Sequence, residues 1–325
     1  MGKKEINPLS YKVGGLLYIP AFQSGAGEKI VNKKIPALSS VAFCLEDAVQ
    51  DAAVLAAERE LYKTLRFIYS NKKEDLPLLF IRVRSFEQME RVEETLDEAR
   101  EIITGYIFPK FDLRNAEDYL KTTEKISRFR QNPIYIMPIL ESKPIADLKT
   151  RVHTLTELRA MLDNAFKYVL NLRVGGNDFS NIYGLRRNAA QTIYDVGVVR
   201  DILMNILNVF ADNYVVSGVA WNYFGAFQNE PWATGLRREL TLDRLNGFIG
   251  KTAIHPSQLP IIKESLSVTA EDYEDACSIL NWSEGVTGVK KSVSGSRMNE
   301  LKCHGKWAKR IKLLGDMYGI RKAEA

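Results

Sequence analysis

The sequence predicts a TIM (β/α)8 barrel with a C-terminal helical extension. Eight short apolar segments alternate with helix-like segments through residue 268, a pattern typical of a parallel sheet covered by helices. Eight strands with intervening helices suit a closed barrel better than an open doubly wound sheet. No glycine-rich dinucleotide fingerprint follows the first strand, which weakens the open-sheet alternative. We therefore expect a catalytic barrel over residues 1–268 and a helical segment over 269–325.

The expected strands are continuously apolar and short. In chain order they cover residues 15–21, 40–48, 76–84, 105–111, 134–141, 168–174, 214–220 and 252–255. Helix-like segments separate most of them: one begins near residue 28, and others cover about 51–69, 86–102, 114–130, 188–211 and 242–248. Burial on both faces explains why these strands lack a polar alternation.

Beyond the expected barrel, the chain becomes basic. Residues 269–272 (TAED) resemble a capping box that starts a helix through residue 280. A Gly/Ser/Val-rich connector is expected over 285–296 and a basic helix over 297–319. Residues 286–325 carry ten Lys/Arg and three Asp/Glu. Such a tail suits an anionic ligand, an acidic neighbouring subunit or simple solvation, whereas its few aromatic residues do not favour nucleic acid.

Composition narrows the class of protein. The chain is 46% hydrophobic and 26% charged, which is ordinary for a soluble globular protein. Its longest apolar runs have the length of strands, so no membrane span is expected. The first residues lack the apolar stretch of a signal peptide, and three scattered cysteines imply no disulfide framework. We expect a cytoplasmic protein.

Charged residues stand where the apolar strands end. In a parallel barrel these ends converge on one mouth, where barrel enzymes carry their active sites. Glu141 and Asp178 come from consecutive strands, and two carboxylates can hold a hard divalent cation. The alternative is that each carboxylate caps the helix that follows its strand. The other charged residues at these ends are Glu46, Asp47, Arg82, Arg84 and Lys110.

Six short motifs occur in a specific order and spacing. They are LEDAV (45–49), IRV (81–83), FPK (108–110), ILE (139–141), GGND (175–178) and GKTAIHP (250–256). Together they resemble the citrate lyase beta-subunit-like branch of the HpcH/HpaI aldolase family, which includes malyl-CoA lyases. The resemblance covers about residues 15–262, with a weaker match beyond.

The resemblance implies a Mg²⁺-dependent enzyme that cleaves or forms a carbon–carbon bond. Glu141 and Asp178 would bind the metal, and Arg82 would hold a substrate carboxylate and neutralise a developing enolate. Glu46 and Asp47 would line the same lip. Beside these roles, we expect Arg84, Lys110, Gly176 and Asn177, which stand at the same strand ends, to bind substrate.

Related lyases take an acid/base group from the C-terminal segment of a neighbouring subunit. The corresponding position here is Glu300, in Met298-Asn-Glu300. The resemblance therefore implies a homo-oligomer in which the C-terminal segment acts as a lid over a neighbouring subunit. An exposed helix glutamate is the alternative interpretation of Glu300.

Departures from the family pattern concern the substrate. Cys44 stands where an Asp commonly precedes the Leu-Glu-Asp triplet, and Arg84 where relatives often have Asn. Lys143, Arg186 and Arg187 add positive charge after the two metal strands. We therefore expect a phosphorylated or multiply anionic substrate in place of citryl-CoA or malyl-CoA, unless the two arginines pair with acids of the protein.

The function that these observations favour is a Mg²⁺-dependent lyase or aldolase. Its small anionic substrate would be a 2-oxo or 3-hydroxy acid or the coenzyme A thioester of such an acid. One alternative is a lyase for a phosphorylated or sugar-derived acid that does not use coenzyme A. Another is a catalytically idle binding or assembly protein that uses the basic tail.

Overall fold

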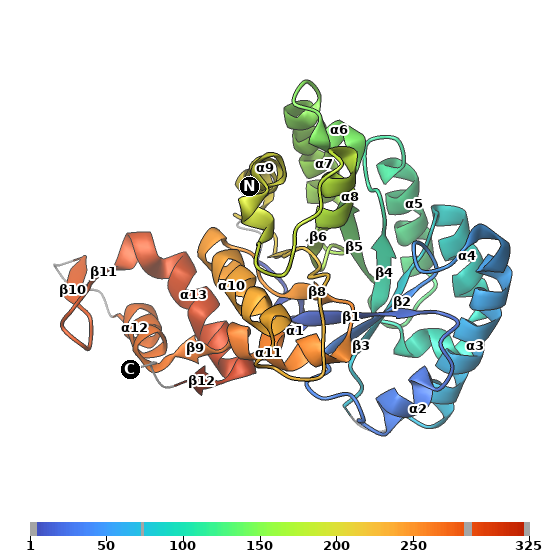
Figure 1. Cartoon of the computed structure of the whole chain (residues 1–325), viewed down its shortest axis with the longest axis horizontal. Helices are drawn as coiled ribbons and strands as arrows, with labels where there is room; N and C mark the ends of the chain where they lie inside the picture. The colour runs from blue at the N-terminus through green and yellow to red at the C-terminus, as the bar shows by residue number, and fades with distance from the viewer. Residues whose placement is uncertain (1–4, 73–74, 283–287, 322–325) are drawn as a thin grey trace. The chain divides into compact units, whose positions relative to one another are not determined.

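The structure, a computed structural model, describes residues 5–72, 75–282 and 288–321 (Figure 1). The chain forms two compact units, residues 1–262 and 263–325. The expected boundary at residue 268 falls inside the second unit. The catalytic and lid roles expected of the two segments remain predictions.

The N-terminal unit is a TIM barrel, as expected. Its strands are β1 (Gly15–Pro20), β2 (Ser40–Cys44), β3 (Leu78–Arg82), β4 (Gly105–Phe108), β5 (Tyr135–Leu140), β6 (Leu172–Val174), β7 (Val216–Ser217) and β8 (Lys251–Ala253). All neighbours are parallel, in the order β7-β6-β5-β4-β3-β2-β1-β8. A bridge between Gly218 and Lys251 joins the two ends of this order. The sheet is therefore nearly closed.

The longer helices flank the strands on the outside (Figure 1), whereas Leu9 of the short α1 packs against the barrel core. The helices in chain order are α1 (Leu9–Lys12), α2 (Ala26–Val31), α3 (Val54–Ser70), α4 (Phe86–Thr95), α5 (Ala116–Ser127), α6 (Lys143–Ala146), α7 (Arg151–Asn164), α8 (Gly176–Ile182), α9 (Gly197–Phe210), α10 (Pro231–Asn246) and α11 (Leu259–Leu266). Short 3-10 segments cover Asp51–Ala53, Asp97–Ile102, Ile193–Asp195 and Pro256–Gln258.

Several helix limits differ from the expected ones. The sequence analysis missed α7, because the buried face of this helix contains Arg151 and Thr154 as well as leucines, so its apolar period is weak. The expected helix at 242–248 is the end of α10, which begins at Pro231 in the first turn, a favoured place for proline. The expected helix at 188–211 begins only at Gly197, after a 3-10 turn.

Strands β6 and β7 are shorter than their apolar segments. Val169 and Leu170 are buried without belonging to β6, although Val169 forms a bridge with Ile136. The apolar segment therefore has two causes: residues of the strand pair with their neighbours, and residues of the loop before the strand are buried. Length alone cannot separate the two causes.

The barrel is apolar inside and becomes polar toward the carboxyl ends of its strands. Leu16, Ala42 and Phe80 belong to the buried core on β1, β2 and β3. Because side chains alternate along a strand, residues two positions further on share the same face. On β1, β2 and β3 these residues are Tyr18, Cys44 and Arg82. The carboxyl ends thus bring polar groups to one mouth.

The C-terminal unit contains α12 (Ala270–Leu280) and α13 (Leu301–Tyr318). Thr269 caps α12, since its side chain accepts a hydrogen bond from the Asp272 amide at 3.1 Å, as the TAED motif predicts. Short strands β9 (Val268–Thr269) and β12 (Ile320–Arg321) pair in parallel.

The predictions for residues 285–296 and 297–319 are wrong in part. Strands β10 (Val289–Lys291) and β11 (Met298–Glu300) form an antiparallel hairpin, and α13 starts only at Leu301. Arg297 and Asn299 anchor this hairpin to the buried carboxylate of Asp275, at 2.8 and 2.9 Å. Because polar contacts anchor the hairpin, its strands lack the alternating apolar residues by which strands are predicted from sequence. Residues 283–287 lie outside the described part.

Every helix within residues 5–72, 75–282 and 288–321 is too short or too polar to cross a membrane.

Gly105 tests the packing of the barrel wall. An added Cβ would lie 1.9 Å from the Tyr135 carbonyl oxygen on the neighbouring strand, a contact that only backbone movement can relieve. We expect Gly105→Ala to lower the free energy of unfolding by about 3 kcal/mol or more, measured by urea denaturation. Gly197→Ala is the control, because its Cβ meets nothing within 4 Å, and its effect should stay within about 1 kcal/mol. Equal effects would contradict this packing.

Candidate active site

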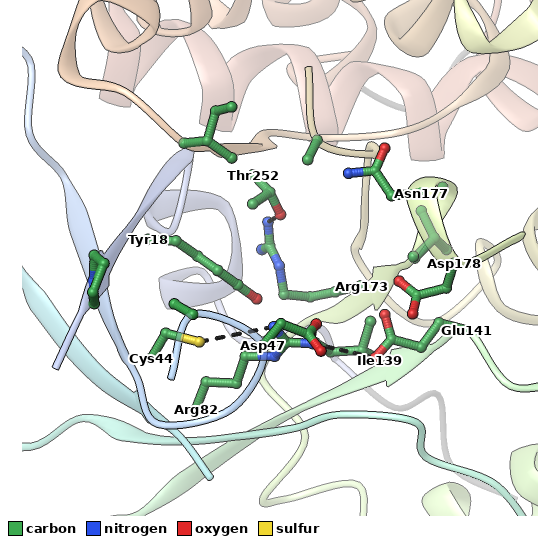
Figure 2. Close-up of a pocket in the computed structure, with 17 residues that line it drawn as sticks. Tyr18, Cys44, Asp47, Arg82, Ile139, Glu141, Arg173, Asn177, Asp178 and Thr252 are labelled. Carbon is green, nitrogen blue, oxygen red and sulfur yellow. Dashed lines mark hydrogen bonds and ion pairs between the residues drawn. The ribbon is translucent and has the colours of Figure 1, made fainter. Parts of the chain in front are cut away.

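A cavity of about 350 Å³ opens at the carboxyl ends of the barrel strands (Figure 2). Its wall mixes apolar and polar side chains from strands and loops on both sides of the barrel. The polar members are Tyr18, Asp47, Arg82, Glu141, Arg173, Asn177, Asp178 and Thr252. Four residues expected at the site from the sequence as metal-binding or catalytic groups therefore share one cavity.

Arg82 is the centre of the ionic network in this cavity. Its side chain is only 5% exposed, at the last position of β3. Its Nη2 atom lies 2.9 Å from Glu46 Oε2, 3.0 Å from Asp47 Oδ2 and 3.4 Å from Glu141 Oε1. The Nη1 atom has only a weak partner, Cys44 Sγ at 3.9 Å, and Nε has none among the described residues. Arg82 therefore keeps donors for a ligand.

Lys110 holds the carboxylates from the other side. Its Nζ donates to Glu46 Oε1 at 2.6 Å, and its backbone amide donates to Glu141 Oε1 at 2.9 Å. The backbone φ of 48° at Lys110 is unusual for a residue with a side chain. Lys110 does not line the cavity, so the structure places it as a support for Glu46 and Glu141.

The pKa values of Glu46 and Asp47 shift in opposite directions. Burial raises the pKa of Glu46 above its ordinary value, although Arg82 opposes that shift. Burial also acts to raise the pKa of Asp47, but the hydrogen bond with Glu46, with Arg82 and Lys110, lowers it overall. Asp47 therefore keeps its negative charge beside Arg82 to a lower pH than Glu46 does.

Glu141 and Asp178 converge, as the sequence predicts. Glu141 follows β5, and Asp178 lies in the first turn of α8. Burial, with repulsion from Asp178, raises the pKa of Glu141 to about 8, while Arg82 opposes the shift. A Cβ on Gly175 would lie 2.2 Å from Glu141 Oε2 and 3.1 Å from Asp178 Oδ2. Only glycine leaves room there for the two carboxylates.

The helix-capping alternative for these two acids is wrong. The N-cap of α8 is Gly175, and the N-cap of α6 is Ser142; neither has a side-chain cap. Two carboxylates without a capping role, one of them held ionisable near neutral pH, fit a divalent cation that takes one or two carboxylates and completes its shell with water and ligand oxygens. The described residues contain no group of three or more His, Cys, Asp or Glu that could hold a metal, so such an ion would depend on these two.

Arg84 lies on the loop after β3. Its Nε donates to the Leu45 carbonyl at 2.7 Å and its Nη2 to the Glu46 carbonyl at 3.2 Å, and it also pairs with Asp51. It is not among the residues that line the cavity. This placement shapes the loop that carries Glu46 and Asp47. The substrate-binding role expected of Arg84 remains a prediction.

Gly176 and Asn177 both line the cavity. A Cβ on Gly176 would lie 2.7 Å from Val219, so glycine is required for packing. Asn177 Oδ1 accepts a hydrogen bond from Asn222 at 2.9 Å. Glu300 belongs to the C-terminal unit, where its amide donates to His304 Nδ1 at 3.0 Å. The binding and acid/base roles expected of these residues remain predictions.

The extra positive charge expected at the mouth is smaller than the sequence suggests. Arg187 is buried, donates to the Ala220 carbonyl at 2.7 Å and pairs with Glu239 at 3.2 Å. Its charge is therefore used inside the protein. Lys143 and Arg186 are exposed and do not line the cavity.

Sequence analysis missed Arg173, Tyr18 and Thr252. Arg173 lies within β6 and is 1% exposed, and its Nη2 donates to Thr252 Oγ1 at 2.6 Å. Figure 2 shows the guanidinium between Tyr18 and Thr252. The available signal was an arginine within a continuously apolar strand, Leu172-Arg-Val174, where a charge requires a partner or a ligand.

The buried Glu141 and the half-buried Asp178 meet beside Arg82 at the mouth of a TIM barrel, where barrel enzymes carry their active sites. The sequence profile of the C–C bond lyase family of the TIM-barrel fold matches residues 7–320. The chain therefore belongs to this family of carbon–carbon lyases, as the resemblance implied. No curated protein matches the chain.

Solved structures share the fold at low sequence identity. A citrate lyase from Burkholderia xenovorans LB400 has a TM-score of 0.68 and 14% identity, and the match covers 99% of this chain and 95% of that one. CitE from Mycobacterium tuberculosis has a TM-score of 0.59 and 18% identity, over 94% and 99% of the two chains. RipC from Yersinia pestis has a TM-score of 0.55 and 17% identity, over 80% and 98%.

Glu141 makes stability depend on pH. Because its pKa of about 8 lies above the ordinary 4.5, the folded state keeps a proton that the unfolded chain releases between these values. The contribution to stability is therefore complete below 4.5 and is lost as the pH rises through about 8. In metal-free protein, Glu141→Gln should remove this loss, so the variant gains stability relative to wild type as the pH rises.

The measurement is urea unfolding in chelator at several pH values across this window. The difference between wild type and variant should change by a few kcal/mol. Parallel pH profiles for the two proteins would contradict the shifted pKa.

Proposed function

We propose that the protein is a Mg²⁺-dependent carbon–carbon lyase for a small 2-oxo or 3-hydroxy acid or its coenzyme A thioester. The observation that carries this proposal is the meeting of the Glu141 and Asp178 carboxylates beside the Arg82 guanidinium in one cavity. Membership of the C–C bond lyase family supports the reaction class.

Glu141 and Asp178 would hold the Mg²⁺ ion. When bound, the ion supplies Lewis-acid polarisation of a substrate carbonyl or hydroxyl oxygen. Solved relatives support the choice of ion and ligand: CitE from Mycobacterium tuberculosis has been crystallised with magnesium, acetoacetate and coenzyme A, and the citrate lyase beta subunit of that organism with oxaloacetate and magnesium.

Arg82 would bind the substrate carboxylate and stabilise the developing enolate. Its unpartnered Nε and weakly bound Nη1 supply donors, and Glu46 and Asp47 fix the guanidinium through Nη2. Cys44 matters here, because a thiol leaves the positive charge less neutralised than an Asp would at the same place. A guanidinium in a dry cavity is a strong stabiliser of an oxyanion.

The reaction also needs a group that moves a proton. In the cleavage direction, the hydroxyl proton leaves to a base, the carbon–carbon bond breaks, and its electron pair forms the enolate, which is then protonated. We propose that Glu300 of a second copy of the chain supplies this group, which requires a homo-oligomer. In this proposal the cavity of one copy binds the anionic substrate, and the C-terminal segment of another copy covers that cavity.

Removing either metal ligand should weaken Mg²⁺ binding strongly. In calorimetry, wild type should bind Mg²⁺, and both Glu141→Gln and Asp178→Asn should lose at least about tenfold in affinity. Glu28→Gln is the control, because Glu28 is an exposed carboxylate of the same unit. Unchanged affinity in either ligand variant would refute the site.

A thermal-shift screen of oxo acids, hydroxy acids and their coenzyme A thioesters then tests the function. We expect a compound that stabilises wild type only in the presence of Mg²⁺ and that does not stabilise Glu141→Gln. Cleavage of the same compound, followed by mass spectrometry, should require the ion. Metal-dependent binding with no cleavage of any bound compound would favour the catalytically idle alternative.

A further inference from the structure

Arg173 is a buried cation without an acidic partner. Its side chain lines the cavity at the mouth of the barrel and is 1% exposed. Nη2 donates to Thr252 Oγ1 at 2.6 Å, and the Tyr18 hydroxyl interacts with the guanidinium, whereas Nε and Nη1 have no well-aligned hydrogen-bond partner among the described residues. No described Asp or Glu side chain lies within ion-pair distance of Arg173.

The other buried cations of the described chain all have carboxylate partners. They are Arg82 with Glu46, Arg151 with Asp201, Arg187 with Glu239, and Lys251 with Glu239 and Asp243. Burial of an unpaired charge is strongly unfavourable. Arg173 therefore does not stabilise the fold through an ion pair, as the other buried cations can.

The charges at the mouth of the barrel also leave the positive charge of Arg173 without a matching negative charge. Arg82 and Lys110 are matched by Glu46 and Asp47. Glu141 and Asp178 would be matched by a divalent cation. With these partners assigned, the guanidinium of Arg173 is the remaining charge in the cavity, and an anion from outside the protein is required to neutralise it.

The strand that carries Arg173 also leads to the metal-binding carboxylate. Arg173 lies within β6, and Gly175, Gly176 and Asp178 follow it directly, all of them lining the same cavity. A molecule held near Asp178 at one end can therefore reach Arg173 with its other end. A volume of about 350 Å³ suits a small acid of this kind.

We propose that Arg173, with Thr252 beside it, binds a second anionic group of the substrate, so that the substrate carries anionic groups at two ends. This inference rests on the proposed function for the position of the first end, near Glu141, Asp178 and Arg82. The second group is a carboxylate or a phosphate, since a guanidinium recognises both through charged hydrogen bonds.

Two matched pairs of ligands test the proposal by calorimetry with Mg²⁺ present. Oxaloacetate differs from pyruvate by a second carboxylate, and 3-phosphoglycerate differs from glycerate by a phosphate. Wild type should prefer the doubly anionic member of at least one pair by about tenfold or more, and that pair identifies the group. In Arg173→Met the preference should disappear, and Mg²⁺ affinity should not change.

Arg186→Met is the matched control, because Arg186 is an exposed arginine outside the cavity. It should keep the wild-type preference. A preference retained in Arg173→Met, or absent from wild type in both pairs, would overturn the proposal. If wild type binds no Mg²⁺, the proposed function fails. The same ligand pairs, measured without the ion, still test Arg173: the proposal requires that wild type prefer the doubly anionic ligand and that Arg173→Met lose this preference.

Stability provides a second readout. Because Arg173 lacks a carboxylate partner, ligand-free Arg173→Met should melt at or above the temperature of wild type, whereas Arg187→Met should melt below it. A large loss of stability in Arg173→Met would show a structural role and contradict the proposal. If Arg173→Met does not fold, Arg173→Lys decides: its preference for the doubly anionic ligand should be smaller than that of wild type, and an unchanged preference would overturn the proposal.

Discussion

The site depends on holding two carboxyl groups together, one of which, Glu141, is buried. Glu141 and Asp178 approach each other across Gly175, where any larger residue would displace a carboxylate. Repulsion and burial both oppose this arrangement, and the raised pKa of Glu141 is their consequence. Arg82 and the Lys110 amide offset part of the cost through Glu141 Oε1. A divalent cation would offset the rest.

Around this pair, the protein separates charges that support the site from charges left for a ligand. Glu46 and Asp47 fix Arg82 and Lys110, and Arg84 fixes the loop that carries both acids. Tight pairing of this kind orients side chains before a substrate arrives. Arg173, by contrast, is buried without a carboxylate partner among the described residues, which is the condition of a group prepared for an anion. The same barrel thus contains arginines that pair with acids of the protein and one, Arg173, that we propose binds a ligand.

The strand-end acids could be predicted because barrel geometry brings the end of every strand to one mouth. Glu141, Asp178 and Arg82 follow from that rule and from the chain order of the motifs. Arg173 could not be predicted as easily, since partners of a buried charge depend on which strands face each other: Thr252 is distant in sequence and meets Arg173 only across the closed barrel. The partner of Arg187 was hidden for the same reason, because Glu239 belongs to α10. Helix α7 was missed because its buried face mixes Arg151 and Thr154 with leucines, and the hairpin of β10 and β11 was missed because polar contacts anchor it.

Family membership defines the fold and the reaction class, while the substrate depends on the side chains of the cavity. The most direct test of the acid pair is a crystal structure of the protein soaked with Mn²⁺, an anomalous scatterer that takes the same oxygen ligands as Mg²⁺. One Mn²⁺ ion should lie between Glu141 and Asp178, about 2.2 Å from an oxygen of each carboxylate. An ion bound at another site, or a pair of carboxyls that share a proton and bind no ion at saturating Mn²⁺, would contradict the metal site.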